Sequence, residues 1–167
     1  MEAHQKTANR SDVVIAEAES AVDYGIGRAM FEEYAAAIDV DLCFQDFAAE
    51  LDRLSVMYGP PAGALFLARS GAETLGCVGL RRFRDDVCEM KRLYVRSEFR
   101  RQHVGRRLAN HTADRARALG YRAMVLDTLG TMEAARALYL SLGFKPSEAY
   151  YTNPIPGVQY FALNLKG

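Results

Sequence analysis

The sequence predicts a mixed α/β fold in which one central sheet carries helices on its faces. Short segments of apolar residues, several of them alternating with polar ones, predict strands, and four longer segments have apolar residues at helical spacing. A helix is expected between the strands at 87–95 and 122–127, which indicates a right-handed parallel crossover. The 167 residues suit one domain spanning 1–167, with residues 1–12 as a flexible N-terminal tail.

The expected order of elements is strand, two helices, three strands, helix, strand, helix and two strands. The strands are predicted at 13–19, 64–69, 75–83, 87–95, 122–127, 144–151 and 158–165. The helices are predicted at 21–38, 44–57, 100–119 and 131–142. Thr131 is a candidate N-terminal cap, and Gly120 and Gly143 are candidate helix stops.

Composition excludes several classes of protein. Half of the residues are hydrophobic, and 21 Lys and Arg balance 21 Asp and Glu, so a general nucleic-acid binder is not expected. No run approaches the ~20 apolar residues of a membrane helix, and the first residues lack the apolar core of a signal peptide, so we expect a cytoplasmic protein without a membrane partner. The three scattered cysteines fit neither a disulfide framework nor a metal site, so no metal is expected.

A basic segment lies between the fourth strand and the third helix. Residues 91–107 contain seven Lys or Arg residues and one acid, Glu98, in a chain that is neutral overall. Unpaired amides and the helix dipole make a helix N-terminus suitable for binding phosphate. The alternative is an Arg-rich, solvated helix face.

The same segment, Arg100-Arg101-Gln102-His103-Val104-Gly105, resembles the acyl-CoA loop of the GNAT superfamily of N-acetyltransferases. The resemblance implies a GNAT-like three-layer fold with a mixed, mostly antiparallel sheet of about seven strands, splayed fourth and fifth strands, and four helices. It also implies acetyl-CoA as the acyl donor. The implied cofactor-binding residues are Leu93, Tyr94, Val95, Arg100, Arg101, Gln102, His103, Val104, Gly105, Arg106, Arg107, Ala135 and Tyr139.

Two positions depart from the family pattern. His103 stands where the family usually has Gly, which changes the loop geometry or the affinity for the cofactor. Its imidazole either contacts a phosphate or is exposed at the helix start. Met132 stands where the family has Asn, so a side-chain hydrogen bond to the pantetheine arm is absent there.

The apolar positions of the fourth strand change parity between Met90 and Leu93, which predicts a β-bulge near Lys91 and Arg92. A strand buried on both faces would give the same pattern. The resemblance favours the bulge and implies a free amide near Leu93 or Tyr94 that stabilises an oxyanion.

The resemblance also implies two catalytic residues. Glu89 corresponds to the carboxylate that serves as general base, directly or through water, in many GNAT enzymes. The alternative is a carboxylate that only pairs with Lys91 or an arginine. Tyr139 corresponds to the tyrosine that protonates the departing thiolate, and the alternative is a core tyrosine.

Acceptor-binding candidates come from the first two helices and the last strands. They are Tyr34, Asp39, Phe44, Tyr150, Tyr151 and Asn153, with Asp41 beside them. Tyrosines and aspartates suit a cationic amine, although Asp39 and Asp41 equally suit a plain turn. The predicted function is transfer of an acetyl group to a primary amine of a small molecule or peptide, by direct attack in a ternary complex. The alternative is a CoA-binding sensor of the same fold, and a homodimer is possible.

Overall fold

A computed structural model describes residues 12–167, except for the side chain of Phe44. The predicted tail at 1–12 therefore lies, apart from Asp12, outside the described residues. The seven strands form one sheet in the order β1-β2-β3-β4-β5-β7-β6. The strands are β1 (Val13–Glu17), β2 (Ala64–Ser70), β3 (Glu73–Arg84), β4 (Val87–Val95), β5 (Ala123–Thr128), β6 (Lys145–Ser147) and β7 (Gln159–Asn164).

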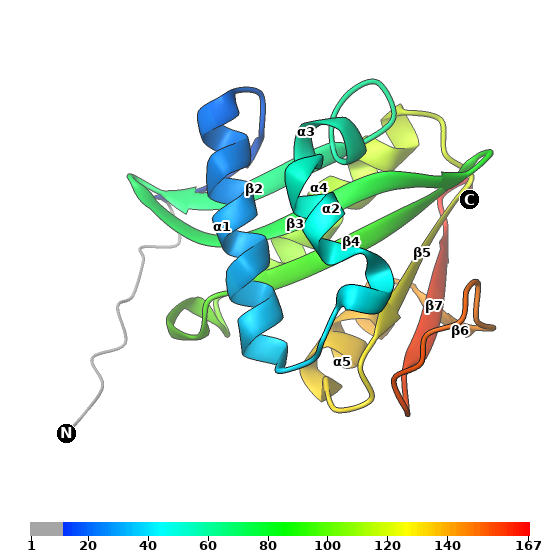
Figure 1. Ribbon diagram of the computed structural model, residues 1–167. Helices are drawn as coiled ribbons and strands as arrows, with labels where there is room; N and C mark the ends of the chain where they lie inside the picture. The colour runs from blue at the N-terminus through cyan, green and yellow to red at the C-terminus, as the bar shows by residue number, and fades with distance from the viewer. Residues whose placement is uncertain (1–11) are drawn as a thin grey trace.

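Neighbouring strands are antiparallel except for the parallel pair β4 and β5. The helices are α1 (Ala21–Ile38), α2 (Phe47–Asp52), α3 (Leu54–Met57), α4 (Val104–Ala118) and α5 (Glu133–Ser141). Figure 1 shows α1, α2 and α3 on one face of the sheet and α4 behind it. The predicted mixed α/β architecture with a mostly antiparallel seven-stranded sheet is confirmed.

Two apolar cores lie on opposite faces of the sheet. Phe31, Leu54 and Tyr58 pack with Leu65 and Leu67 under α1 and α3. The larger core joins α4 and α5 to the other face and includes Leu108, Met124 and Tyr139. Alternate residues of β2 belong to different cores, as the two-residue repeat of a strand requires. The three-layer arrangement therefore follows from strands that are apolar on both faces.

Several predicted boundaries are wrong. The helix expected at 44–57 is divided into a short 3₁₀ turn (η2, Cys43–Gln45), α2 and α3, because Asp46 adopts a left-handed conformation and Arg53 leaves the helical region. α4 begins at Val104 rather than at 100, after a short 3₁₀ turn (η3, Ser97–Phe99). Thr131 does not cap α5; Met132 precedes the helix and makes no side-chain capping bond.

The last pair of strands also differs from the prediction. The strand expected at 144–151 is limited to β6, at Lys145–Ser147. The residues after β6 leave the sheet, and Tyr150 and Tyr151 place their hydroxyls on carboxylates of β4 and β5. These side-chain bonds are present where strand pairing was expected for Tyr150 and Tyr151.

The middle of β4 carries the predicted bulge. Lys91 pairs with Gly79 and Tyr94 pairs with Cys77, so two residues of β4 stand opposite Val78 alone. Arg92, one of the two, has a φ of 60°, in the left-handed region. β4 pairs with β5 only through Val87–Glu89, and the two strands then part. The expected splay of the fourth and fifth strands is therefore confirmed.

Candidate active site

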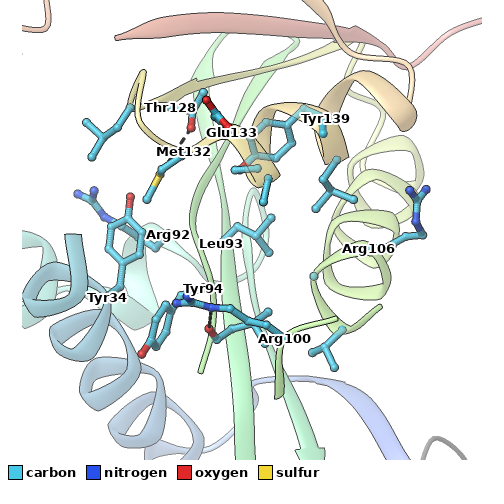
Figure 2. A pocket seen from close by; sticks show the side chains of 18 of the residues that line it. Tyr34, Arg92, Leu93, Tyr94, Arg100, Arg106, Thr128, Met132, Glu133 and Tyr139 are labelled. Atoms are coloured by element: carbon cyan, nitrogen blue, oxygen red, sulfur yellow. Dashed lines mark hydrogen bonds between the residues drawn. The ribbon is translucent and has the colours of Figure 1, made fainter. Parts of the chain in front are cut away.

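A cavity of about 1050 Å³ lies where β4 and β5 part. It has two sides, which are seen in Figure 2. The loop side consists of residues 93–95, 99–101 and 103–106 together with α5. The tyrosine side is lined by Tyr34, Lys91, Arg92 and Asp127. In Figure 2 the labelled Tyr34 and Arg92 lie across the cavity from Arg106.

The loop side presents unpaired main-chain amides. Within the described chain, residues 101–106 make no hydrogen bond through their main-chain N–H groups, whereas the amide of Arg107 bonds to the carbonyl of His103 at 3.0 Å. The first amides of a helix have no partner within it, and the preceding turn adds further free amides here. Such a row of donors at a helix start suits a phosphate.

The arginines of this loop are not neutralised by protein carboxylates. Arg100, Arg101, Arg106 and Arg107 form no ion pair with any described residue. Arg100 donates to the carbonyl of Val95 at 3.1 Å, and Arg106 to the hydroxyl of Ser141 at 2.7 Å. The loop therefore keeps a net positive charge for a ligand.

The other three basic residues of the 91–107 segment lie elsewhere. Arg96 pairs with Glu33 of α1, and Arg92 with Glu50 of α2. Lys91 is buried on the tyrosine side. The seven basic residues thus do not form one patch; four remain at the loop and three leave it.

His103 has the backbone conformation of the glycine it replaces. Its φ of 62° lies in the left-handed region, and it immediately precedes α4. Its imidazole is exposed and makes no capping bond with the helix. The substitution therefore retains the turn and the amide. A Cβ added at Gly105 would lie 3.6 Å from Leu138 and 3.7 Å from Val95, at ordinary van der Waals distance, so the fold leaves room for a small side chain there.

Tyr139 lies on α5 and lines the cavity. Its ring contacts Phe144 and Phe161 in the core, and Figure 2 shows the side chain at the edge of the cavity. Among residues 12–167 nothing hydrogen-bonds its hydroxyl. Burial raises the pKa of this phenol, so the group stays protonated and is available as a donor.

Glu89 does not line the cavity. Its side chain is 1% exposed; one carboxylate oxygen accepts a 2.8 Å hydrogen bond from Nε of Arg81 and lies 2.7 Å from Nη2 of the same guanidinium. The hydroxyl of Tyr150 donates to its other oxygen, and Lys91 lies 3.9 Å away. The pairing expected as the alternative for Glu89 is therefore present in the structure.

The remaining predicted acceptor residues divide into two groups. Tyr34 lines the cavity, while Tyr150, Tyr151 and Asn153 lie beside it in a hydrogen-bonded network. Asp39 is exposed at the end of α1 with a φ of 50°, as in a turn, and is not a cavity residue. Asp41 accepts from the amide of Cys43 and also forms a turn. The side chain of Phe44 lies outside the described residues.

Among the cofactor candidates, Gln102 and Arg107 do not line the cavity, whereas the other eleven do. Ala135 lines the cavity, as does Met132, which stands where the family pattern has Asn. Met132 accepts a 3.6 Å bond at sulfur from Thr128. The missing hydrogen bond to a pantetheine arm at this point of the wall stays a prediction.

Two features of the tyrosine side were missed in the sequence. Asp127 lines the cavity and accepts bonds from Tyr151 and from Asn153, the latter at 3.0 Å. Its place at the carboxyl end of a parallel strand is a signal for it, because ligands of α/β sheets lie there. The second feature is the buried pair of Glu50 and Arg92, whose members are 42 positions apart.

No group of three or more His, Cys, Asp or Glu side chains in the described part of the chain is placed to hold a metal ion. No helix there has the length and apolar character to span a membrane.

The parted strands, the bulge and the loop of free amides define an N-acetyltransferase fold, and sequence comparison gives the particular family. Residues 25–144 match the Acetyltransferase (GNAT) family. A Schizosaccharomyces pombe protein described as an uncharacterized N-acetyltransferase is 44% identical over 138 residues, covering 81% of this chain and 85% of the relative. A similarly described Dictyostelium discoideum protein is 29% identical over 199 residues, covering 82% and 92%. The chain belongs to the GNAT acetyltransferase family.

Solved structures agree on the fold. A GNAT-family acetyltransferase from Staphylococcus aureus Mu50 matches with a TM-score of 0.75 and 17% identity, over 92% of this chain and 99% of that one. A Salmonella typhimurium protein solved with its cofactor acetyl-CoA matches with a TM-score of 0.66 and 18% identity, over 93% and 95%. At these identities the likeness concerns the fold.

Proposed function

We propose that this protein transfers an acetyl group from acetyl-CoA to a primary amine, by direct attack of the amine while both substrates are bound. The main support is the row of unbonded amides at residues 101–106, beside four arginines without carboxylate partners. A diphosphate fits this arrangement of donors and charge. The acetyl-CoA bound to the Salmonella typhimurium relative of the same fold adds to that support.

The residues of the loop side would hold the donor. The unbonded amides of residues 102–106 would bind the diphosphate, and Arg100, Arg101 and Arg106 would supply charge around it. The main chain of Leu93 and Val95, left without a partner strand where β5 departs, would pair with the pantetheine arm. The small side chain of Ala135, on α5, leaves space for that arm. Acetyl-CoA supplies the activated thioester; the chain supplies its position.

The chemistry needs a proton acceptor and a proton donor. A protonated alkylamine, with a pKa near ~10, cannot attack until it loses a proton. Glu89 remains the proposed acceptor, acting through water or through the Tyr150 hydroxyl, which donates to its carboxylate. The ion pairs with Arg81 and Lys91 are the contacts that this role has to overcome. When the new N–C bond forms and the C–S bond breaks, Tyr139 would donate its proton to the sulfur. The amide of Leu93 or Tyr94 would stabilise the carbonyl oxygen.

Calorimetry and melting experiments with millimolar acetyl-CoA test the donor assignment. We expect binding heat and a raised melting temperature, since a ligand of the native state stabilises it. Release of free thiol in the presence of an amine panel then tests transfer. No binding would overturn the proposal, and binding without thiol release for any amine would indicate the CoA sensor instead. The cytoplasmic location of the protein and its assembly into a homodimer stay predictions.

A further inference from the structure

Three cations lie near the bulge, and two of them, Lys91 and Arg92, are buried. Arg92 forms two hydrogen bonds with Glu50, at 2.9 and 3.0 Å. The partly exposed Arg81 forms an ion pair and one hydrogen bond with Glu89. Each of these carboxylates is therefore held by one arginine. The third cation, Lys91, lies on β4 between Glu89 and Arg92 in the sequence.

Lys91 has no counter-ion at hydrogen-bond distance. Its side chain is 6% exposed, and its ammonium lies 3.4 Å from the Gln45 amide oxygen and 3.9 Å from Glu89. Charge-assisted bonds are normally shorter, at ~2.7–2.9 Å. Buried charges are usually paired because desolvation is costly, and burial lowers the pKa of this lysine. Lys91 lines the cavity, so a ligand there can supply the missing anion.

Asp127 also lies on the tyrosine side of the cavity, and it is an anion without a cation close by. One carboxylate oxygen accepts bonds from Tyr151 and Asn153, and no described cation lies within ion-pair distance of the carboxylate. Its second oxygen receives no hydrogen bond from residues 12–167. Lys91 and Asp127 line the same cavity but do not form an ion pair with each other. The cavity thus holds one cation without a counter-ion at hydrogen-bond distance and one carboxylate without a cation at ion-pair distance.

We infer that the acceptor is a free α-amino acid, whose carboxylate binds Lys91 and whose ammonium binds Asp127. This inference rests on the proposed acetyl transfer. A zwitterion brings the counter-ion that each residue lacks and leaves the charge of the cavity unchanged. A polyamine or an aminoglycoside would place cations against Lys91 and leave that ammonium unpaired. The amine loses its proton to the acceptor group before it attacks the thioester, and the product is an N-acetyl amino acid.

The test compares each amino acid with the amine that lacks only its carboxylate, such as phenylalanine with phenethylamine and leucine with isopentylamine. We expect kcat/KM to be at least about tenfold higher for the amino acid, as suits a charge-assisted bond. Lys91→Met, which keeps length without charge, should remove this preference through a higher KM for the amino acid, so that kcat/KM becomes about equal for each amino acid and its amine. Lys91→Arg should restore part of it. Lys145→Met, at an exposed lysine of β6, is the matched control and should change nothing.

The outcomes separate the two proposals. Equal rates for amino acids and their decarboxylated partners, or an unchanged preference in Lys91→Met, would overturn the amino-acid assignment and leave acetyl transfer standing. Transfer only to other amines, such as a peptide terminus, would also overturn it. A lack of thiol release with every amine and amino acid tested would overturn the transferase function itself.

Discussion

The two sides of the cavity are built in different ways. The loop side uses main-chain atoms from consecutive residues, and its free amides follow from one turn and one helix start. The tyrosine side uses side chains that are far apart in sequence: Gln45 bonds Tyr151 across 106 positions, and Tyr150 bonds Glu89 across 61. A ligand that every member of the family shares can be bound by local backbone. A ligand that differs between members needs side chains, which can change one at a time.

The largest effect is expected when one charge of the ion pair that connects α2 to the bulge is removed. Glu50→Gln leaves the Arg92 guanidinium buried between the rings of Tyr34 and Phe47 without a counter-ion. We expect a loss of about 3–5 kcal/mol in the free energy of unfolding, because an uncompensated buried charge remains. Urea denaturation at constant slope measures it.

The matched control is the exposed pair of Arg28 and Asp52, whose side chains are 47% and 70% exposed. Asp52→Asn should change the free energy of unfolding by less than about 0.5 kcal/mol. Adding Arg92→Met to Glu50→Gln should recover at least half of the loss, since no buried charge is then unpaired. A loss below about 1 kcal/mol in Glu50→Gln would mean that the pair does not hold the tyrosine side together.

The difference between the two sides also sets what could be predicted from sequence. The seven strands came from the apolar patterns, the bulge from a change of parity together with the family resemblance, and the parting of β4 and β5 from the resemblance alone. Glu50 was not predicted, because the sequence does not distinguish a buried acid from an exposed one such as Asp52, and its partner is 42 positions away. The strand predicted through Tyr151 ends early for a similar reason: the hydroxyls of Tyr150 and Tyr151 bond carboxylates on β4 and β5, far away in the sequence.

The second experiment concerns the one side chain of the loop side that we place in the chemistry. Tyr139→Phe removes a hydroxyl that no described residue bonds, so the fold should be kept. We expect the rate of the transfer step to fall at least tenfold, about 1.4 kcal/mol in the barrier, with little change in acetyl-CoA affinity. Single-turnover kinetics and calorimetry give the two quantities separately. Weakened binding with an unchanged rate would make Tyr139 a packing residue.

The smallest effect is expected at His103, where the departure from the family pattern can be reversed. His103→Gly keeps the amide and occupies the left-handed conformation without the cost that a side chain carries there. Glycine also gains freedom in the unfolded chain, which offsets part of the relief. We therefore expect the free energy of unfolding to rise by no more than about 1 kcal/mol or to stay level, with acetyl-CoA affinity kept.

Ala29→Gly, at an exposed position within α1, is the control for the change to glycine itself. It should cost about 1 kcal/mol, because its backbone is helical and gains nothing from glycine's wider range. If His103→Gly costs as much as Ala29→Gly, the left-handed turn carries no strain. If it instead weakens acetyl-CoA binding while stability holds, then the imidazole contacts the ligand, and the loop side depends on a side chain as the tyrosine side does.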